Sequence, residues 1–186
     1  MGATEASAAV CDAGPLIHLD ELDALDLLAD FRDVFVPSAV WREVEHHRSS
    51  ALSRPGVALT RVVPRAEPDA HFLALAQGFS LDAGEREALL VALEHAEALL
   101  LTDDAAARLA GELLRLRVHG TIGVLIRAIR RRQRSPSEVI SLIERIPARS
   151  SLHVRPALVQ EVLDHLRREY ADALSRDPTT SQGQQG

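Results

Sequence analysis

Two short apolar runs that end directly in acidic residues constrain the fold of this chain more than any other feature. The run AAVC at 8–11 is followed by Asp12 and then by Ala-Gly-Pro, which favours a turn. The run LLL at 99–101 is followed by Thr-Asp-Asp. Short runs without polar residues are typical of strands that are buried on both faces of a parallel sheet. The sequence therefore predicts a buried parallel sheet with acids at the ends of two strands.

Further short strands alternate with amphipathic helices along the chain. We expect strands at 34–36, within 57–63 and around 118, and a loop directly after Asp12. We expect helices at 22–28, 38–45, 83–95, 104–116, 121–134, from 136 onward, and at 155–174. The predicted fold class is α/β, a three-layer α/β/α sandwich with a parallel central sheet. In such sheets the functional crevice lies beyond the carboxyl ends of the strands.

The length and composition fit one domain. The chain has 186 residues, of which 46% are hydrophobic and 26% charged, enough to bury one core. We expect a single domain over residues 1–174, in which 145–174 is a C-terminal helical extension. The remainder, 175–186, is rich in Ser, Thr, Gln and Gly and is predicted to be a disordered tail.

The location of the protein follows from what the sequence lacks. No apolar run approaches the ~20 residues that span a bilayer, and Glu5 without a basic segment argues against a signal peptide. Cys11 is the only cysteine, which excludes an internal disulfide and a multi-cysteine zinc site. We therefore expect a cytoplasmic protein with no membrane partner.

All 21 basic residues are arginines, and the net charge is −6. The absence of lysine excludes phosphate-loop and Schiff-base chemistry, and the negative charge excludes a globally basic nucleic-acid coat. Five arginines are clustered at the end of one predicted helix: Arg127, Arg130, Arg131, Arg132 and Arg134. This run is either a solvated face that complements the helix terminus or a contact for RNA phosphates.

Six acidic residues are candidates for a metal site. Three follow predicted strands, two lie in the first turn of the helix at 83–95, and one lies in the helix after Pro37: Asp12, Asp103, Asp104, Glu85, Glu87 and Glu43. Like charges in a partly desolvated cleft require protons or a cation, and oxygen ligands without cysteine or paired histidine select Mg²⁺ or Mn²⁺. Such clusters activate water for phosphodiester hydrolysis. Because Glu85 and Glu87 cannot share one helix face, one of them would act through water.

Each of these residues also has a purely structural interpretation. Asp12 fits a turn, Glu85 closes a capping box with Asp82, and Glu43 fits a solvated helix surface. The hydroxyl of Thr121 either bonds a carboxylate or caps its helix, and Thr102 or Asp103 caps the next helix. Their joint placement at one edge of the sheet favours the functional interpretation.

These segments resemble the PIN-domain family, in particular the branch related to VapC-type toxins. Asp12 in VCDAGPLIHL is similar to the first catalytic aspartate of the family, and Glu43 in VWREVE to its helix-borne glutamate. GEREALLVAL contains Glu85 and Glu87 and is similar to the third acidic position. LLLTDD, with the Asp pair at 103–104, is similar to the fourth. With HGTIGVLIRA the resemblance covers roughly residues 8–146.

The resemblance implies a Rossmann-like sandwich and a Mg²⁺- or Mn²⁺-dependent endoribonuclease that acts as the toxin of a toxin-antitoxin pair. The implied catalytic residues are Asp12, Glu43, Glu87 and Asp104. The implied metal ligands are Asp12, Glu85, Glu87, Asp103 and Asp104, with Thr102 and Thr121 orienting them. The expected partners are RNA, an antitoxin protein and, as a further option, a second copy of the chain.

The sequence departs from the family near the first aspartate. Where many PIN proteins carry Ser or Thr, this chain has Ala13 and Gly14, so a hydroxyl is missing. Such groups orient metal ligands. This favours a second hypothesis, a catalytically weak or inactive PIN-like module that binds a protein or RNA partner, whereas the complete set of acids favours the nuclease.

Overall fold

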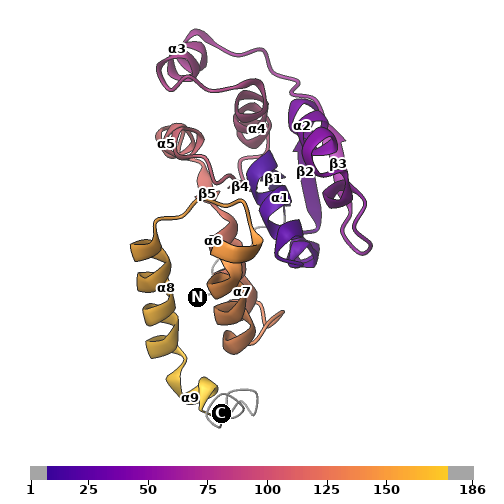
Figure 1. Ribbon diagram of the computed structural model, residues 1–186. Helices are drawn as coiled ribbons and strands as arrows, with labels where there is room; N and C mark the ends of the chain where they lie inside the picture. Colours follow the sequence, from indigo (N-terminus) through magenta and orange to yellow (C-terminus); the bar gives the residue numbers. More distant parts are fainter. Residues whose placement is uncertain (1–7, 176–186) are drawn as a thin grey trace.

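One sheet of five parallel strands forms the centre of the protein (Figure 1). The computed structural model describes residues 8–175. The strand order is β3-β2-β1-β4-β5, so that β1 is central. The strands are β1 (Ala8–Cys11), β2 (Asp33–Pro37), β3 (Leu59–Val62), β4 (Leu99–Leu101) and β5 (Arg117–His119). The predicted parallel sheet is confirmed.

Helices cover both faces of this sheet. The helices are α1 (Ala13–Glu21), α2 (Ser38–Arg48), α3 (Ala70–Gly78), α4 (Ala83–Glu94), α5 (Ala105–Leu113), α6 (Thr121–Arg130), α7 (Pro136–Arg149), α8 (Pro156–Glu169) and α9 (Ala171–Leu174), with 3₁₀ turns η1 (Leu25–Asp30) and η2 (Ser49–Leu52). Alternate residues of β1 face opposite layers. Cys11 packs with residues of α1, α6 and α7, whereas Val10 packs with residues of α3, α4 and α5. The three-layer α/β/α sandwich is therefore confirmed.

Three expectations about local structure were wrong. The predicted loop after Asp12 is the helix α1, because Asp12 caps its N-terminus and Pro15 lies in the first turn, where its missing N–H costs little. The predicted helix at 22–28 is instead the 3₁₀ turn η1, preceded by Asp23 at a φ of 55°. The last predicted helix is divided into α8 and α9 at Tyr170.

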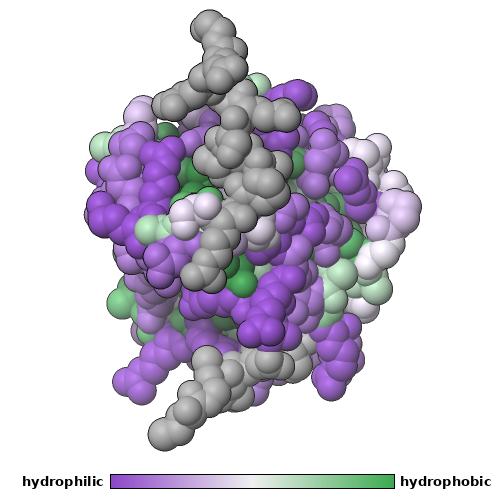
Figure 2. Space-filling view, turned by 90° about the horizontal axis from the view of Figure 1, so that it is seen from below, coloured by the Kyte–Doolittle hydropathy of each residue, from purple (hydrophilic) through white to green (hydrophobic). Residues whose placement is uncertain are grey.

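The segment after α7 packs on the helical layer that contains α6 and α7. Val159, Leu163 and Leu166 of α8 are buried in the same cluster as Ile143 and Ile146 of α7. On the face shown in Figure 2, hydrophilic side chains predominate and the visible apolar ones form small, separate patches. No helix among residues 8–175 is both long enough and apolar enough to cross a membrane. Of the predicted tail at 175–186, all but Ser175 lies outside the described residues.

Candidate active site

An acidic cleft of about 320 Å³ lies where β1 and β4 end. The Asp12 N–H donates to the Leu101 carbonyl and the Thr102 N–H donates to the His119 carbonyl, both at 2.9 Å, which continues the sheet beyond its strands. The cleft is lined by Asp12, Ala13, Gly14, His18, Glu43, Asp82, Glu85, Asp103, Asp104, Ser151, Leu152 and His153. It lies at the carboxyl edge of the sheet, where the sequence predicted it.

Asp12 is the most deeply placed acid of the cleft, with 7% of its surface exposed. Its carboxylate accepts hydrogen bonds from the Ala13 N–H and the Thr102 hydroxyl, both at 2.8 Å. Burial raises the pKa of Asp12 to about 6, against the lowering effect of these two bonds, and the charges of Asp82 and Glu43 raise it further. Ala13 and Gly14 have no hydroxyl to offer Asp12, and Thr102, directly after the neighbouring strand β4, supplies one instead.

Asp103 and Asp104 follow β4 but have different contacts. Asp103 accepts hydrogen bonds from the Thr121 N–H at 2.8 Å and from the Thr121 hydroxyl at 2.6 Å, and lies 2.8 Å from His18 Nδ1. Asp104 caps α5 by accepting from the Ala107 N–H at 2.8 Å. Of the two structural roles open to Thr121, the bond to a carboxylate is the one observed.

The opposite wall of the cleft comes from the start of α4. Asp82 and Glu85 exchange hydrogen bonds of 2.9 and 2.8 Å as a capping box, which confirms that prediction. Partial burial, together with the charges of Asp82, Asp104 and Asp12, raises the pKa of Glu85 to about 7. Gly84 permits this close packing, since a Cβ at that position would lie 3.3 Å from Glu43 Oε2.

Glu43 reaches the cleft from α2, so the placement that the sequence left open is settled. Partial burial and the charge of Asp82 raise its pKa. Glu87 does not line the cleft. Its carboxylate accepts from the Ala39 N–H at 2.8 Å at the first turn of α2, because a two-residue spacing turns it away from Glu85. Glu87 thus holds the helix that carries Glu43.

The arginine run lies at the end of α6 opposite Thr121, the residue that contacts the site. Arg127 and Arg131 bond Asp30 at 2.6 and 2.8 Å, and Arg134 bonds Asp26 at 2.6 Å. Arg130 and Arg132, the remaining members of the run, are exposed. The structure therefore gives three of the five arginines an intramolecular partner and brings none of them to the cleft.

The donor chemistry of the cleft fits a hard divalent cation. Its acids contribute only oxygen, and three of them have raised pKa values, first because they are buried or partly buried and second because other carboxylates lie nearby. Within residues 8–175, however, no three acidic, histidine or cysteine side chains are arranged to hold an ion as they stand. Binding of an ion there would therefore require side chains of the cleft to rearrange.

Some lining residues were not predicted. Asp82 was assigned only as a helix cap, although its distance of three residues from Glu85 already placed it in the same turn. His18 was not predicted, because we expected a loop after Asp12 instead of the helix α1 that carries His18. Ser151 and His153 belong to the segment between α7 and α8, which we call the 150–155 strap, and only tertiary structure brings it to the cleft.

Comparison with known proteins identifies the family. No curated protein and no solved structure matches the chain significantly. A family model described as a PIN domain matches residues 8–168, which include every strand and every acid of the cleft. Proteins of this kind are generally nucleases. The chain belongs to the PIN-domain family.

Proposed function

We propose that this protein is a Mg²⁺- or Mn²⁺-dependent endoribonuclease that hydrolyses RNA phosphodiester bonds in the acidic cleft. The observation that carries the proposal is that Asp12, Glu43, Glu85 and Asp104, which come from separate elements, line one cleft at the carboxyl edge of the sheet. Burial and the neighbouring carboxylates raise the pKa values of Asp12, Glu43 and Glu85, and a hard divalent ion in the cleft would offset both effects.

The residues of the cleft take separate roles in this proposal. Asp12, Glu43, Glu85 and Asp104 would hold the ion, whereas Asp103 is fixed by Thr121 and shapes the wall beside it. When bound, the ion supplies hydroxide at neutral pH and stabilises the leaving oxygen. Glu87, predicted as a ligand, would act only by holding α2 in place.

Thr102 determines how Asp12 is presented. Its hydroxyl donates to one carboxylate oxygen and its oxygen accepts the Asp104 N–H at 3.2 Å, so one side chain aligns two proposed ligands. This contact also weighs against the inactive binding module, because that alternative depended on a missing hydroxyl near Asp12.

The test is cleavage of RNA by the purified protein with Mn²⁺ or Mg²⁺. Cleavage should stop with EDTA and in the variant with Asp12→Asn and Asp104→Asn. The matched control, Glu161→Gln on the exposed surface of α8, should leave the rate unchanged. A folded protein that binds Mn²⁺ but cuts no RNA would overturn the proposal.

The biological role as a toxin is part of the same proposal, and it rests on the resemblance to VapC-type proteins. Induced synthesis of the protein in a bacterium should then stop growth, and the double variant should not. A cognate antitoxin should restore growth. Normal growth during synthesis of a protein that cleaves RNA in the assay would refute the toxin role while leaving the nuclease.

A further inference from the structure

A second groove continues from the acidic cleft toward α8. It has a volume of about 510 Å³ and shares Asp103, Leu152 and His153 with the cleft. Its walls are β5, the first turn of α6, the 150–155 strap and α8. We call it the β5–α8 groove. A strand of nucleic acid in the cleft would have to leave it somewhere, and the shared residues place this groove directly beside the cleft.

The charge of the β5–α8 groove is opposite to that of the cleft. Its lining contains Arg108, Arg155 and two histidines, against a single carboxylate, that of Asp103. The oxygens of Asp103 already accept from Thr121 and contact His18. The groove therefore presents net positive charge beside a cleft that presents negative charge. This arrangement suits an RNA strand with one phosphate on a metal ion in the cleft and the neighbouring phosphate in the groove.

Arg108 is held in position by its surroundings. Its Nη2 donates to the Thr102 carbonyl at 3.1 Å, directly behind the proposed ligands. A Cβ at Gly120 would lie 2.8 Å from this Nη2 and 2.6 Å from Asp103 Oδ1, so only glycine lets both groups approach. The guanidinium has several further N–H donors for a ligand.

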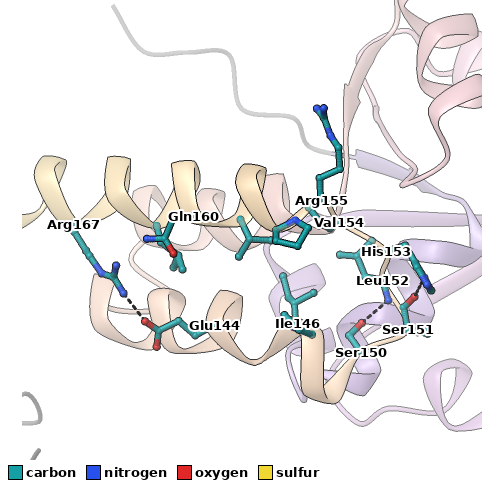
Figure 3. A pocket seen from close by; sticks show the side chains of 14 residues that line it. Glu144, Ile146, Ser150, Ser151, Leu152, His153, Val154, Arg155, Gln160 and Arg167 are labelled. Atoms are coloured by element: carbon teal, nitrogen blue, oxygen red, sulfur yellow. Dashed lines mark hydrogen bonds and ion pairs between the residues drawn. The ribbon is translucent and has the colours of Figure 1, made fainter.

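Arg155 lies on the other side of the groove. It is exposed, and within residues 8–175 it forms no ion pair or hydrogen bond through its side chain. Figure 3 shows its guanidinium pointing away from Ile146 and Glu144 of α7. Arg127, Arg131 and Arg134 differ, since their charges are met by aspartates.

The remainder of the groove is apolar. Six side chains form this part: Val118, Ile122, Leu152, Val154, Leu158 and Val162. An apolar surface beside fixed cations matches a nucleotide, which has a flat base and a charged phosphate, and the volume lies in the usual range for a small-ligand site. A purely apolar docking site would not need the two guanidinium groups of Arg108 and Arg155.

We propose that the β5–α8 groove binds the RNA nucleotide next to the scissile phosphate, with its phosphate against Arg108 and Arg155 and its base on the apolar lining. This inference rests on the proposed nuclease function and assigns its substrate contacts to the strap and α8. It replaces the arginine run of α6 as the RNA surface.

The test measures RNA binding without cleavage, in full-length protein carrying Asp12→Asn. A fluorescent single-stranded RNA of about ten nucleotides is titrated at several salt concentrations. Arg108→Gln and Arg155→Gln should each weaken binding several-fold and reduce the salt slope by about one. The control variant, Arg130→Gln with Arg132→Gln at the end of α6, should bind within about twofold of the parent.

A second measurement does not depend on substitution. RNA containing 4-thiouridine, cross-linked to the same protein, should label peptides that contain residues 152–162. Labels confined to α6, unchanged salt slopes in the groove variants, or no RNA binding at all would each overturn the inference. If the wild-type protein cuts no RNA but binding depends on Arg108 and Arg155, the nuclease proposal fails and the groove stands.

Discussion

Thr102 links two acids of the cleft through one hydroxyl, and this makes its removal informative. In Thr102→Val the buried Asp12 carboxylate loses a donor while the side-chain shape is kept. We expect the free energy of unfolding to fall by about 1–3 kcal/mol and Mn²⁺ affinity to fall about 10–100-fold. Chemical denaturation and calorimetry measure the two effects. Thr60→Val, at an exposed position of β3, is the control, and equal Mn²⁺ affinity in both variants would contradict the assigned role.

The acids of the cleft also predict how stability depends on pH. The pKa of Asp12 rises from 3.8 to about 6 and that of Glu85 from 4.5 to about 7. Folding thus favours their protonated forms, so this contribution is complete below about pH 4 and is lost as the pH rises through 6 and 7. The free energy of unfolding of metal-free protein should therefore fall over that range.

Urea denaturation at a series of pH values measures this fall. Asp12→Asn should make it shallower, because one of the two titrating groups is gone. Added Mn²⁺ should reverse it, since metal binds the deprotonated acids. Metal-free protein whose stability stays level or rises between about pH 5 and pH 7 would show that burial and neighbouring charges do not raise the pKa values of these acids as described.

At the scale of single residues, the sequence predicted which acids lie at the edge of the sheet better than it predicted which groups they contact. Asp12 and Asp104 could be placed at the edge of the sheet because they come one and three residues after apolar strands, a purely local signal. Glu87 was grouped with Glu85 although it bonds α2, a helix more than forty residues earlier in the chain. The aspartates at 26 and 30 that pair with the arginine run were likewise invisible without the tertiary fold.

Among the elements, α6 is the one whose position controls the site most directly. It begins after Gly120, where any side chain would overlap Asp103 and Arg108. Gly120→Ala should displace this turn and lower the free energy of unfolding by about 1–3 kcal/mol. It should also impair Mn²⁺ binding. Gly78→Ala is the control, because its Cβ would meet nothing within 4 Å.

Thermal unfolding and Mn²⁺ titration of the two glycine variants check this prediction. Gly78→Ala should be neutral or slightly stabilising, since alanine restricts the unfolded chain and favours a helix. If Gly120→Ala were as stable as Gly78→Ala, the approach of Asp103 and Arg108 would be looser than the structure shows.

The elements that the sequence missed are the short helices. α1 has nine residues and starts with Ala-Gly-Pro, which read as a turn because Gly and Pro are poor helix formers. α3 also has nine residues. Only Phe72 and Ala76 of these are buried, which is too few to give a recognisable helical period of apolar residues. Both bury apolar side chains in the hydrophobic clusters of the protein, which local propensity does not report. The alternation of longer helices with apolar strands was enough to predict the sandwich.

For the molecule as a whole, the burial of α8 in the core shared with α7 predicts one cooperative unfolding transition. Leu166 is fully buried, so Leu166→Ala should lower the free energy of unfolding by about 2–5 kcal/mol. Leu158→Ala, at a position 40% exposed, should cost much less. Fluorescence of Trp41, the only tryptophan, reports on α2, whereas circular dichroism reports on all helices.

The two signals should give coincident transitions in the wild type, and both should shift together in Leu166→Ala. Such a result would support the proposal that the sequence up to residue 174 folds as a single domain. An early loss of helix signal while Trp41 remains in its native environment would show instead that the C-terminal helices unfold separately.

The contribution of the strap to the cleft has a consequence for the order in which the protein becomes active. Ser151 and Leu152 close the same cavity that Asp12 lines, and Glu21 fastens the strap by accepting from Ser150 and Ser151. During synthesis the segments that carry Asp12 and Glu43 leave the ribosome long before β4 and the strap have been made. A partly made chain thus has neither the complete cleft nor the groove beside it, so the proposed nuclease activity would begin only after residues 150–155 have emerged and packed against the cleft.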